Sequence, residues 1–250
     1  MNGESTPARP AARLAALAAA LWMAAPGAQA ASYVEAFSGP LNAALWHLED
    51  GGNSYTVDGG ELFFTRKTGN SAWLEFAPRL IGNFDVSFRY RLIDWVSTYG
   101  FGDRLQLDVH NPLPTSLGHA VGRSQEGGIA GGYHFAITNS ACCAFLGPTS
   151  ADVVTLRATR VAGVVRLSIH DGSQWQQVGP DSPSDTRDMT LRFSAYTHRG
   201  FVPDTRYAID DFSIWAEGFS QPVPEPAAAA MLLAGLAVLG VAARRRSPRA

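Results

Sequence analysis

The residues best suited to bind a polar ligand lie in the stretch 105–110, where apolar and polar side chains alternate. In a strand, the apolar positions would point to one face, and Gln106, Asp108 and His110 to the other. An amide, a carboxylate and an imidazole in a row could form hydrogen bonds with sugar hydroxyl groups. The alternative interpretation is an ordinary solvent-exposed face of a sheet.

A second candidate is a cluster of aromatic side chains in a glycine-containing loop between Asp94 and Asp103. Trp95, Tyr99 and Phe101 could stack on the apolar faces of pyranose rings. Their alternative role is to form an apolar plug over one end of the domain.

Paired carboxylates, which a glycosidase would need, are not evident. Retaining hydrolysis uses two carboxyl groups about 5–5.5 Å apart, and positions i and i+2 on one face of a strand nearly supply that distance. The nearest carboxylates in the sequence are Asp103/Asp108, Asp210/Asp211, Asp185/Asp188 and Glu49/Asp50. The first two pairs would lie on opposite faces of continuous strands, and the third falls in a polar loop. We therefore assign no catalytic residue, with an active site assembled from distant strands as the alternative.

Metal-binding patterns are weak. The six histidines show no paired ligand spacing, so we expect no transition-metal site and no cofactor. Calcium stays open as an alternative, because Asp181, Asp185 and Asp188 could converge on one ion.

Two further stretches are expected to be loops. Residues 118–132 are rich in glycine but lack Gly-Lys-Ser/Thr, which favours a mobile loop over a phosphate site. The only cysteines, Cys142 and Cys143, are neighbours, and a disulfide between them would be strained. We expect two small side chains in a partly buried loop.

Short alternating segments separated by Gly, Pro, Asn and Asp must position these residues. The clearest is 84–92, which alternates like a half-buried strand, and Asp171-Gly172 is a hairpin turn signal. The expected strands are 33–37, 55–57, 61–65, 72–76, 84–92, 105–109, 132–138, 154–160, 164–170, 175–178, 190–196 and 206–215. No convincing amphipathic helix interrupts them, so the sequence predicts an all-β, two-sheet antiparallel sandwich.

Several of these segments resemble concanavalin A-like lectin/glucanase domains, in that family's order. The matching pieces are 37–46 (FSGPLNAALW), 58–62 (DGGEL), 82–89 (GNFDVSFR), Asp171-Gly172 followed by Trp175, and 209–214 (IDDFSI). The resemblance implies a jelly roll whose concave face often binds glycans. Glycosidases of this fold carry a Glu-x-Asp-x-Glu triplet on one strand, and this sequence contains none.

The C-terminal end has three parts in a fixed order: Val223, Pro224, Glu225 and Pro226, then the apolar run 227–243, then Arg244, Arg245 and Arg246. As a helix, the run would be roughly 26 Å long at ~1.5 Å per residue, close to the ~30 Å hydrocarbon thickness of a membrane. The arginines would hold its end in the cytoplasm. This arrangement resembles the PEP-CTERM sorting signal, which implies processing by an exosortase, transport to the cell surface and an association with exopolysaccharide. The alternative is a permanent single-span anchor.

The N-terminal end fits a secretory signal peptide. Arg9 and Arg13 precede the apolar stretch 14–25, and Ala28-Gln29-Ala30 has the form of a cleavage site. We expect signal peptidase to cut after Ala30. The sequence thus divides into a signal peptide (1–30), a β-sandwich domain (31–221) and a sorting signal (222–250).

The formal net charge of −2 hides an uneven distribution. Six of the arginines lie in the two end segments, whereas Glu4 is the only acidic residue in the N-terminal segment, so the part between is acidic. An acidic exported domain argues against nucleic acid as a partner. We expect a protein that passes through an inner-membrane intermediate to the cell surface or extracellular matrix and binds polysaccharide there. A glycoside hydrolase or lyase and a purely structural matrix protein are the alternatives.

Overall fold

The computed structural model describes residues 30–94, 103–111, 118–124, 132–139, 141–184, 187–197 and 204–221. In these residues all regular structure is β-strand, which confirms the all-β prediction. None of these described segments forms a helix of the length and apolarity needed to cross a membrane. The predicted signal peptide and the predicted C-terminal span lie outside them.

All strand pairs are antiparallel. The strands are β1 (Ala31–Glu35), β2 (Trp46–Glu49), β3 (Ser54–Asp58), β4 (Glu61–Thr65), β5 (Ala72–Asp94), β6 (Asp103–His110), β7 (Gly118–Ser124), β8 (Tyr133–Thr138), β9 (Ala141–Pro148), β10 (Val153–Val161), β11 (Val164–His170), β12 (Trp175–Gln177), β13 (Ser182–Pro183), β14 (Met189–Thr197) and β15 (Arg206–Phe219).

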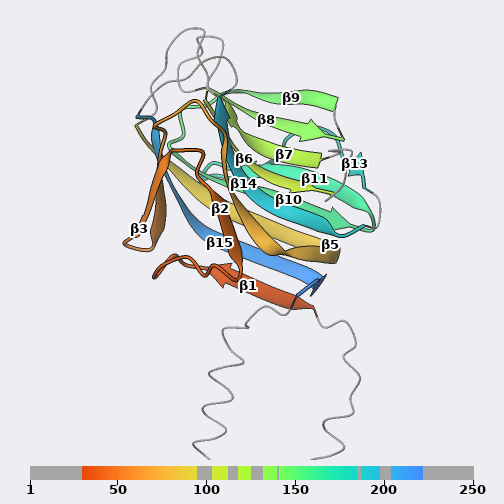
Figure 1. The fold of residues 1–250 in the computed structure, drawn as a ribbon. Coiled ribbons are helices and arrows are strands. Elements are labelled where there is room, and N and C mark those ends of the chain that lie inside the picture. The colour runs from red at the N-terminus through yellow and green to blue at the C-terminus, as the bar shows by residue number, and fades with distance from the viewer. Residues whose placement is uncertain are drawn as a thin grey trace, which may run out of the picture.

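The strands form two layers that share the long strand β5 (Figure 1). Residues 72–80 of β5 pair with β2 and β14, so this half belongs to a front sheet in the order β2-β5-β14-β6-β7-β8-β9. Residues 80–94 pair with β10 and β15 and belong to a back sheet, which continues through β11 to β12 and through β15 to β1 and β4. Contacts of β10 and β11 with β6 and β7 show that the two sheets face one another.

Alternating side chains of both sheets fill the space between the layers. Along β5 every second residue is buried from Ala72 to Leu80 and again from Phe84 to Leu92, with Phe88 at 0% exposure. Its ring meets Phe193 of the front sheet edge-on, with centroids 5.4 Å apart, and stacks on Phe212 of the back sheet at 5.1 Å. Burying one such side chain contributes roughly 1.5–3 kcal/mol. The period-two pattern of the sequence therefore predicts the core correctly.

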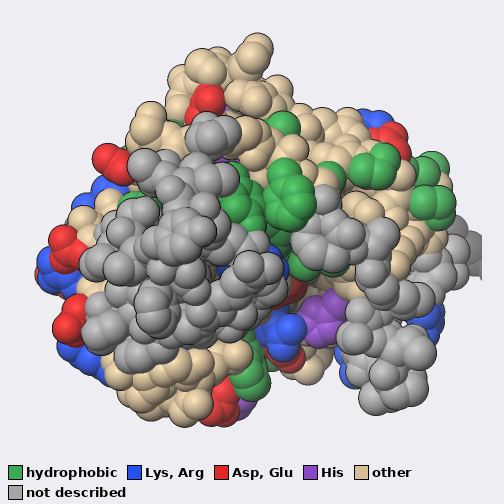
Figure 2. Space-filling view, turned by 90° about the horizontal axis from the view of Figure 1, so that it is seen from above, with side chains coloured by type: hydrophobic (Ala, Val, Ile, Leu, Met, Phe, Trp, Pro, Cys, Tyr) green, Lys and Arg blue, Asp and Glu red, His purple; other side chains and the backbone are tan. Residues whose placement is uncertain are grey.

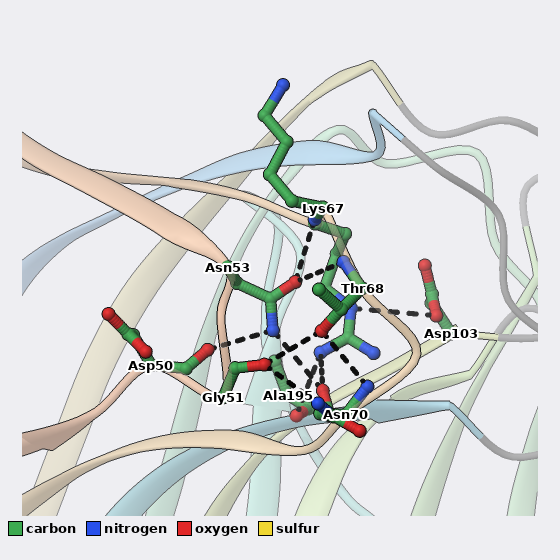
Figure 3. Close-up of polar contacts among 9 residues, drawn as sticks. Asp50, Gly51, Asn53, Lys67, Thr68, Asn70, Asp103 and Ala195 are labelled. Atoms are coloured by element: carbon green, nitrogen blue, oxygen red, sulfur yellow. Dashed lines mark hydrogen bonds and ion pairs between the residues drawn. The ribbon is translucent and has the colours of Figure 1, made fainter.

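A buried arginine, Arg66, organises one end of the sandwich. The polar contacts at this end include Asn53, Thr68, Asn70 and Asp103 (Figure 3). The Arg66 Nη1 donates to the Asn70 carbonyl oxygen at 2.8 Å, and its Nε lies 3.8 Å from Asp103 Oδ1. Asn53 Nδ2 donates to the same Asn70 oxygen at 3.2 Å, while its Oδ1 accepts from the Thr68 backbone N–H at 3.0 Å. These contacts fasten the loops after β2 and β4 to the start of β6. Since losing one partner of a buried ion pair costs about 3–5 kcal/mol, Arg66 is a strong constraint on this end.

The structure corrects three sequence-based predictions. Segments 72–76 and 84–92 are halves of the single strand β5. Residues 118–124, expected in a mobile loop, form β7 inside the front sheet. Cys142 and Cys143, also expected in a loop, lie on β9. The strand β7 was not predicted because Gly122, like other glycines in this stretch, is typical of a turn. In the structure Gly122 is required by close packing, since a Cβ there would lie 2.2 Å from the Leu105 carbonyl oxygen.

The substitution Gly122→Ala tests this packing. We expect it to lower the free energy of unfolding by about 1–3 kcal/mol, because β6 and β7 must separate to admit the methyl group. Gly147→Ala is the matched control, since a Cβ at this β9 position meets nothing within 4 Å. Urea denaturation of both variants measures the difference, and equal stabilities would contradict the close approach of β7 to β6.

Candidate functional site

The front sheet places the predicted polar stripe on its outer face. Leu105, Leu107 and Val109 of β6 are completely buried between the sheets, so Gln106 and Asp108 point the other way. The expected alternation is thus confirmed, but the alternative of a solvent-exposed face is wrong. Gln106 is 8% and Asp108 7% exposed.

A groove on this face, here called the front groove, has a volume of about 250 Å³. It is lined by Ser71, Ala72, Trp73, Gln106, Arg192, Ser194 and Ala195. Cross-strand register explains the grouping: Ser194 of β14 lies opposite both Gln106 of β6 and Trp73 of β5. His110 follows further along β6 and is not part of the lining. The structure thus brings Gln106 and Asp108 together and leaves His110 apart.

Asp108 lies at the centre of the polar contacts of the front groove. Gln106 Nε2 donates to its Oδ1, and Ser194 Oγ donates to its Oδ2. The Nε of Arg192 lies 3.8 Å from Oδ2, and the Arg192 guanidinium lies 5.5 Å from the centroid of the Trp73 ring. A carboxylate, an amide, a hydroxyl, a guanidinium and an aromatic ring therefore meet over three neighbouring strands.

Burial dominates the electrostatics of this face. It raises the pKa of Asp108 to about 6, and hydrogen bonds from Ser194 and Gln106 together with the Arg192 charge offset only part of that shift. Burial and, to a lesser degree, Arg192 lower the pKa of His110 to about 4, so its imidazole is neutral at pH 7. Arg192 is thus the principal cation beside Asp108.

Several polar atoms on this face have no hydrogen-bond partner within the described part of the chain. They are Gln106 Oε1, Arg192 Nε and His110 Nδ1. Leaving a buried donor or acceptor unsatisfied costs about 1–3 kcal/mol, so a ligand with hydroxyl groups or ordered water would be favoured at the groove. These atoms are themselves shielded from solvent, but the Gln106 and Arg192 side chains that carry them line the groove.

Sequence reasoning missed Trp73, Arg192 and Ser194. The sequence pattern could have placed all three on the outer face of a sheet. Trp73 lies between the buried Ala72 and Leu74, and Arg192 and Ser194 alternate with the buried Leu191, Phe193 and Ala195. What the sequence lacks is the strand order that makes β5, β14 and β6 neighbours. The predicted aromatic residues Trp95, Tyr99 and Phe101 lie outside the described residues.

Of the carboxylate pairs predicted to lie on opposite faces of a strand, one does so and the other does not. Asp103 and Asp108 lie on opposite faces as expected, since Asp103 turns inward to Arg66. The prediction for Asp210 and Asp211 is wrong: both accept hydrogen bonds from Arg89. The cause is a bulge in β15, where Asp211 has φ of 52° and the register shifts, so alternation fails locally.

The aspartates considered for calcium do not form a cluster in the described residues. Asp181 forms a two-pronged ion pair with Arg166, with N–O distances of 2.9 and 2.6 Å, and hydrogen bonds from Arg166 lower its pKa. Asp188 is described and Asp185 is not. Across the described segments, no three His, Cys, Asp or Glu side chains gather as metal ligands would.

Comparisons with known proteins support both resemblances. The PEP-CTERM protein-sorting motif matches residues 222–246, which implies export through a membrane-anchored intermediate to the cell surface and processing by an exosortase. The predicted motif residues Val223–Pro226 and Arg244–Arg246 fall within this match, outside the described residues. No curated protein matches the sequence.

Among solved structures, the metal-free lectin I-B4 from Griffonia simplicifolia has a TM-score of 0.54 at 10% identity, covering 74% of this chain and 98% of that one. The Bauhinia forficata lectin in complex with GalNAc has 0.52 at 9%, covering 75% and 98%. The exoplasmic/lumenal domain of VIP36 in its Ca²⁺/Man3GlcNAc-bound form has 0.50 at 11%, covering 80% and 94%. These likenesses confirm the concanavalin A-like jelly roll as the fold.

The raised pKa of Asp108 predicts a pH-dependent effect of Asp108→Asn. Between about pH 4 and pH 6 the folded protein holds a proton on Asp108 that the unfolded chain releases, so the stability contributed by Asp108 falls as pH rises through this window. Asparagine does not titrate, so the stability of the variant relative to the parent should increase by ~2 kcal/mol from pH 4 to pH 7. Histidine titrations are common to both proteins and cancel. Urea unfolding at the two pH values measures the difference, and a pH-independent difference would contradict the assignment.

Proposed function

We propose that this protein is an exported, exosortase-processed surface protein that binds polysaccharide in the front groove and does not cleave it. The PEP-CTERM motif supports the route to the cell surface. The lectin-like jelly roll is a fold on which sugar binding occurs, since two of the similar structures are described as complexes with GalNAc and with Man3GlcNAc. The proposal rests chiefly on the groove itself.

The observation that carries the proposal is the meeting of Trp73 with Gln106 and Arg192. A pyranose ring has an apolar face and a rim of hydroxyl groups, so it needs an aromatic surface beside donors and acceptors. Trp73 supplies the ring, and the Gln106 and Arg192 side chains, which line the groove beside it, carry an amide and a guanidinium group for hydrogen bonds to hydroxyl groups. Asp108 orients Gln106 and Ser194 from below through its two oxygens.

Charge also favours a neutral glycan over a polyanion. Several of the described arginines are matched by carboxylates, as in Arg89 with Asp210 and Arg91 with Glu61. Figure 2 shows basic and acidic side chains lying next to one another at the edge of the face seen from above. Such paired charges create no extended positive field that would attract nucleic acid or an acidic polymer.

The geometry gives less support to catalysis. In the front groove and directly beneath it, Asp108 is the only carboxylate among the described residues. Glu75 lies on the same face, but β14 separates the two strands, which places the backbones roughly 10 Å apart. Arg192 stands between them at the same register. This arrangement differs from the closely spaced pair of a retaining glycosidase.

Substitutions in the front groove test the binding proposal. Arg192→Ala and Gln106→Ala should each weaken binding of the mature protein to its polysaccharide at least tenfold, because each removes a hydrogen-bonding group. Affinity electrophoresis through gels containing dextran, mannan, galactan or the host's own exopolysaccharide measures the loss. Arg79→Ala is the control, since Arg79 is exposed and outside the groove. Unchanged retardation of both variants would refute the front groove, and release of oligosaccharides that Asp108→Asn abolishes would favour the enzyme alternative.

The sorting proposal has a separate test. Mass spectrometry of the protein from its native host should find a chain that begins at Ala31 and ends near the Pro224–Pro226 motif. Replacing Pro224 and Pro226 by alanine should leave the C-terminal arginines attached, because the recognised motif is lost. A native protein that keeps Arg244–Arg246 would contradict exosortase processing and favour the permanent anchor.

A further inference from the structure

A second groove lies on the opposite side of the molecule, on the outer face of the back sheet. This back groove has a volume of about 610 Å³. Its lining includes Asp85, Ser87, Arg157, Thr159, Trp175 and Trp215. No residue of the front groove takes part in it.

Two tryptophans at the ends of the back groove are unusually open to solvent. Trp175 of β12 is 45% exposed and Trp215 of β15 is 41% exposed, whereas tryptophan side chains are highly buried on average. Trp175 is held in place by its neighbours: the Arg157 guanidinium lies 5.1 Å from its ring, and the His170 ring lies 5.2 Å away. Both rings therefore lie at the surface of the sheet, and neighbouring side chains position that of Trp175.

Strand register sets the distance between the two rings. Trp215 lies opposite Asp85 of β5, and Trp175 lies opposite His170 of β11. The strands β15, β5, β10, β11 and β12 follow one another, so four strand spacings separate the two tryptophan backbones, roughly 19 Å across the sheet. The groove between them runs obliquely over the strands and is long enough for several sugar rings in a row.

The floor between the tryptophans is polar but carries no net charge. Arg157 makes a two-pronged ion pair with Asp85, and Arg166 makes one with Asp181. The remaining floor positions include Ser87, Thr159 and Ser168, whose hydroxyl groups can both donate and accept hydrogen bonds. A neutral, hydroxyl-lined floor between two separated aromatic rings matches a chain of neutral sugars.

From these observations we propose that the back groove is a second polysaccharide-binding site, in which Trp175 and Trp215 stack on sugar rings and the Asp85–Arg157 pair binds hydroxyl groups between them. Because the two grooves lie on opposite faces, one molecule can hold two polysaccharide chains and cross-link them. The ligand class follows the proposed function, but the site rests on different residues and can be tested on its own.

A protein partner fits this surface less well. Protein interfaces bury a continuous apolar centre, whereas here ion pairs and hydroxyl groups separate the two tryptophans. Isolated aromatic rings spaced along a polar floor instead suit a ligand that alternates apolar faces with hydroxyl groups. A second copy of the chain would have to bury Asp85 and Arg157, at a cost in desolvation.

The test uses the mature protein from its native host and the double variant Trp175→Ala/Trp215→Ala. Affinity electrophoresis through dextran, mannan, galactan and the host's exopolysaccharide measures binding, and turbidity after mixing with the soluble polymer measures cross-linking. Tyr55→Ala is the matched control, because Tyr55 of β3 is a 42% exposed aromatic residue outside the groove. Both tryptophans are exposed, so thermal unfolding should show that the double variant still folds.

We expect the double variant to lose at least tenfold in affinity for one polymer and to form no cross-linked precipitate, while Tyr55→Ala behaves like the parent. Arg192→Ala, which alters only the front groove, should also stop precipitation.

If the double variant binds and precipitates like the parent, or if its only change is the loss of a dimer in sedimentation, the back groove is refuted. A loss confined to Arg192→Ala refutes the back groove alone, and a loss confined to the double variant refutes the front groove alone. If the parent binds none of these polymers, both sites are refuted.

Discussion

One strand, β5, constrains both faces of this molecule. It pairs in the front sheet over residues 72–80 and in the back sheet over residues 80–94, and its even-numbered side chains are buried from Ala72 to Leu80 and from Phe84 to Leu92, on both sides of the crossing. Gly82, with φ of 67°, lies just beyond the crossing. Since the inner face of β5 never changes, its odd-numbered residues must face outward in both sheets. They supply Trp73 to the front groove and Asp85 and Ser87 to the back groove. The two proposed sites are thus opposite outer faces of one continuous strand.

The two outer faces differ in the burial and hydrogen bonding of their polar side chains. On the front face, Asp108 and Gln106 are buried, the pKa of Asp108 is raised, and some polar atoms have no partner in the described chain. Such an arrangement lowers stability unless something satisfies these groups, which is typical of a binding site. On the back face, Arg157 and Asp85 satisfy one another and remain about a third exposed. That face gains little stability from the pair but keeps a rigid, solvated floor.

Much of this fold can be predicted from period-two alternation, and the failures have a common cause. Strands such as β10 and β11 were evident because one face is buried and the other is not. β7 was missed because both of its faces are buried and Gly122 is required by contact with β6, so neither alternation nor composition marks it as a strand. The bulge at Asp211 was missed because a local break in register leaves no trace in residue types. For the candidate site, alternation placed Gln106 and Asp108 on one face, but grouping Trp73 and Arg192 with them needed the strand order, which depends on long-range pairing.

Export and a two-faced binding geometry are physically consistent with one another. A lone shallow groove for a neutral sugar binds weakly, because most of the hydrogen bonds it forms replace equally good ones with water. A polymer changes this balance: it offers many copies of the same unit, so a molecule held at one groove meets further units at a high effective concentration at the other. Two grooves on opposite faces of a sandwich cannot easily bind the same short segment of one polymer. The increase in effective affinity therefore applies when the two grooves bind two different chains. An acidic domain exported to the cell surface with both proposed grooves would then act as a junction between polymers, where many weak contacts together give a stable matrix.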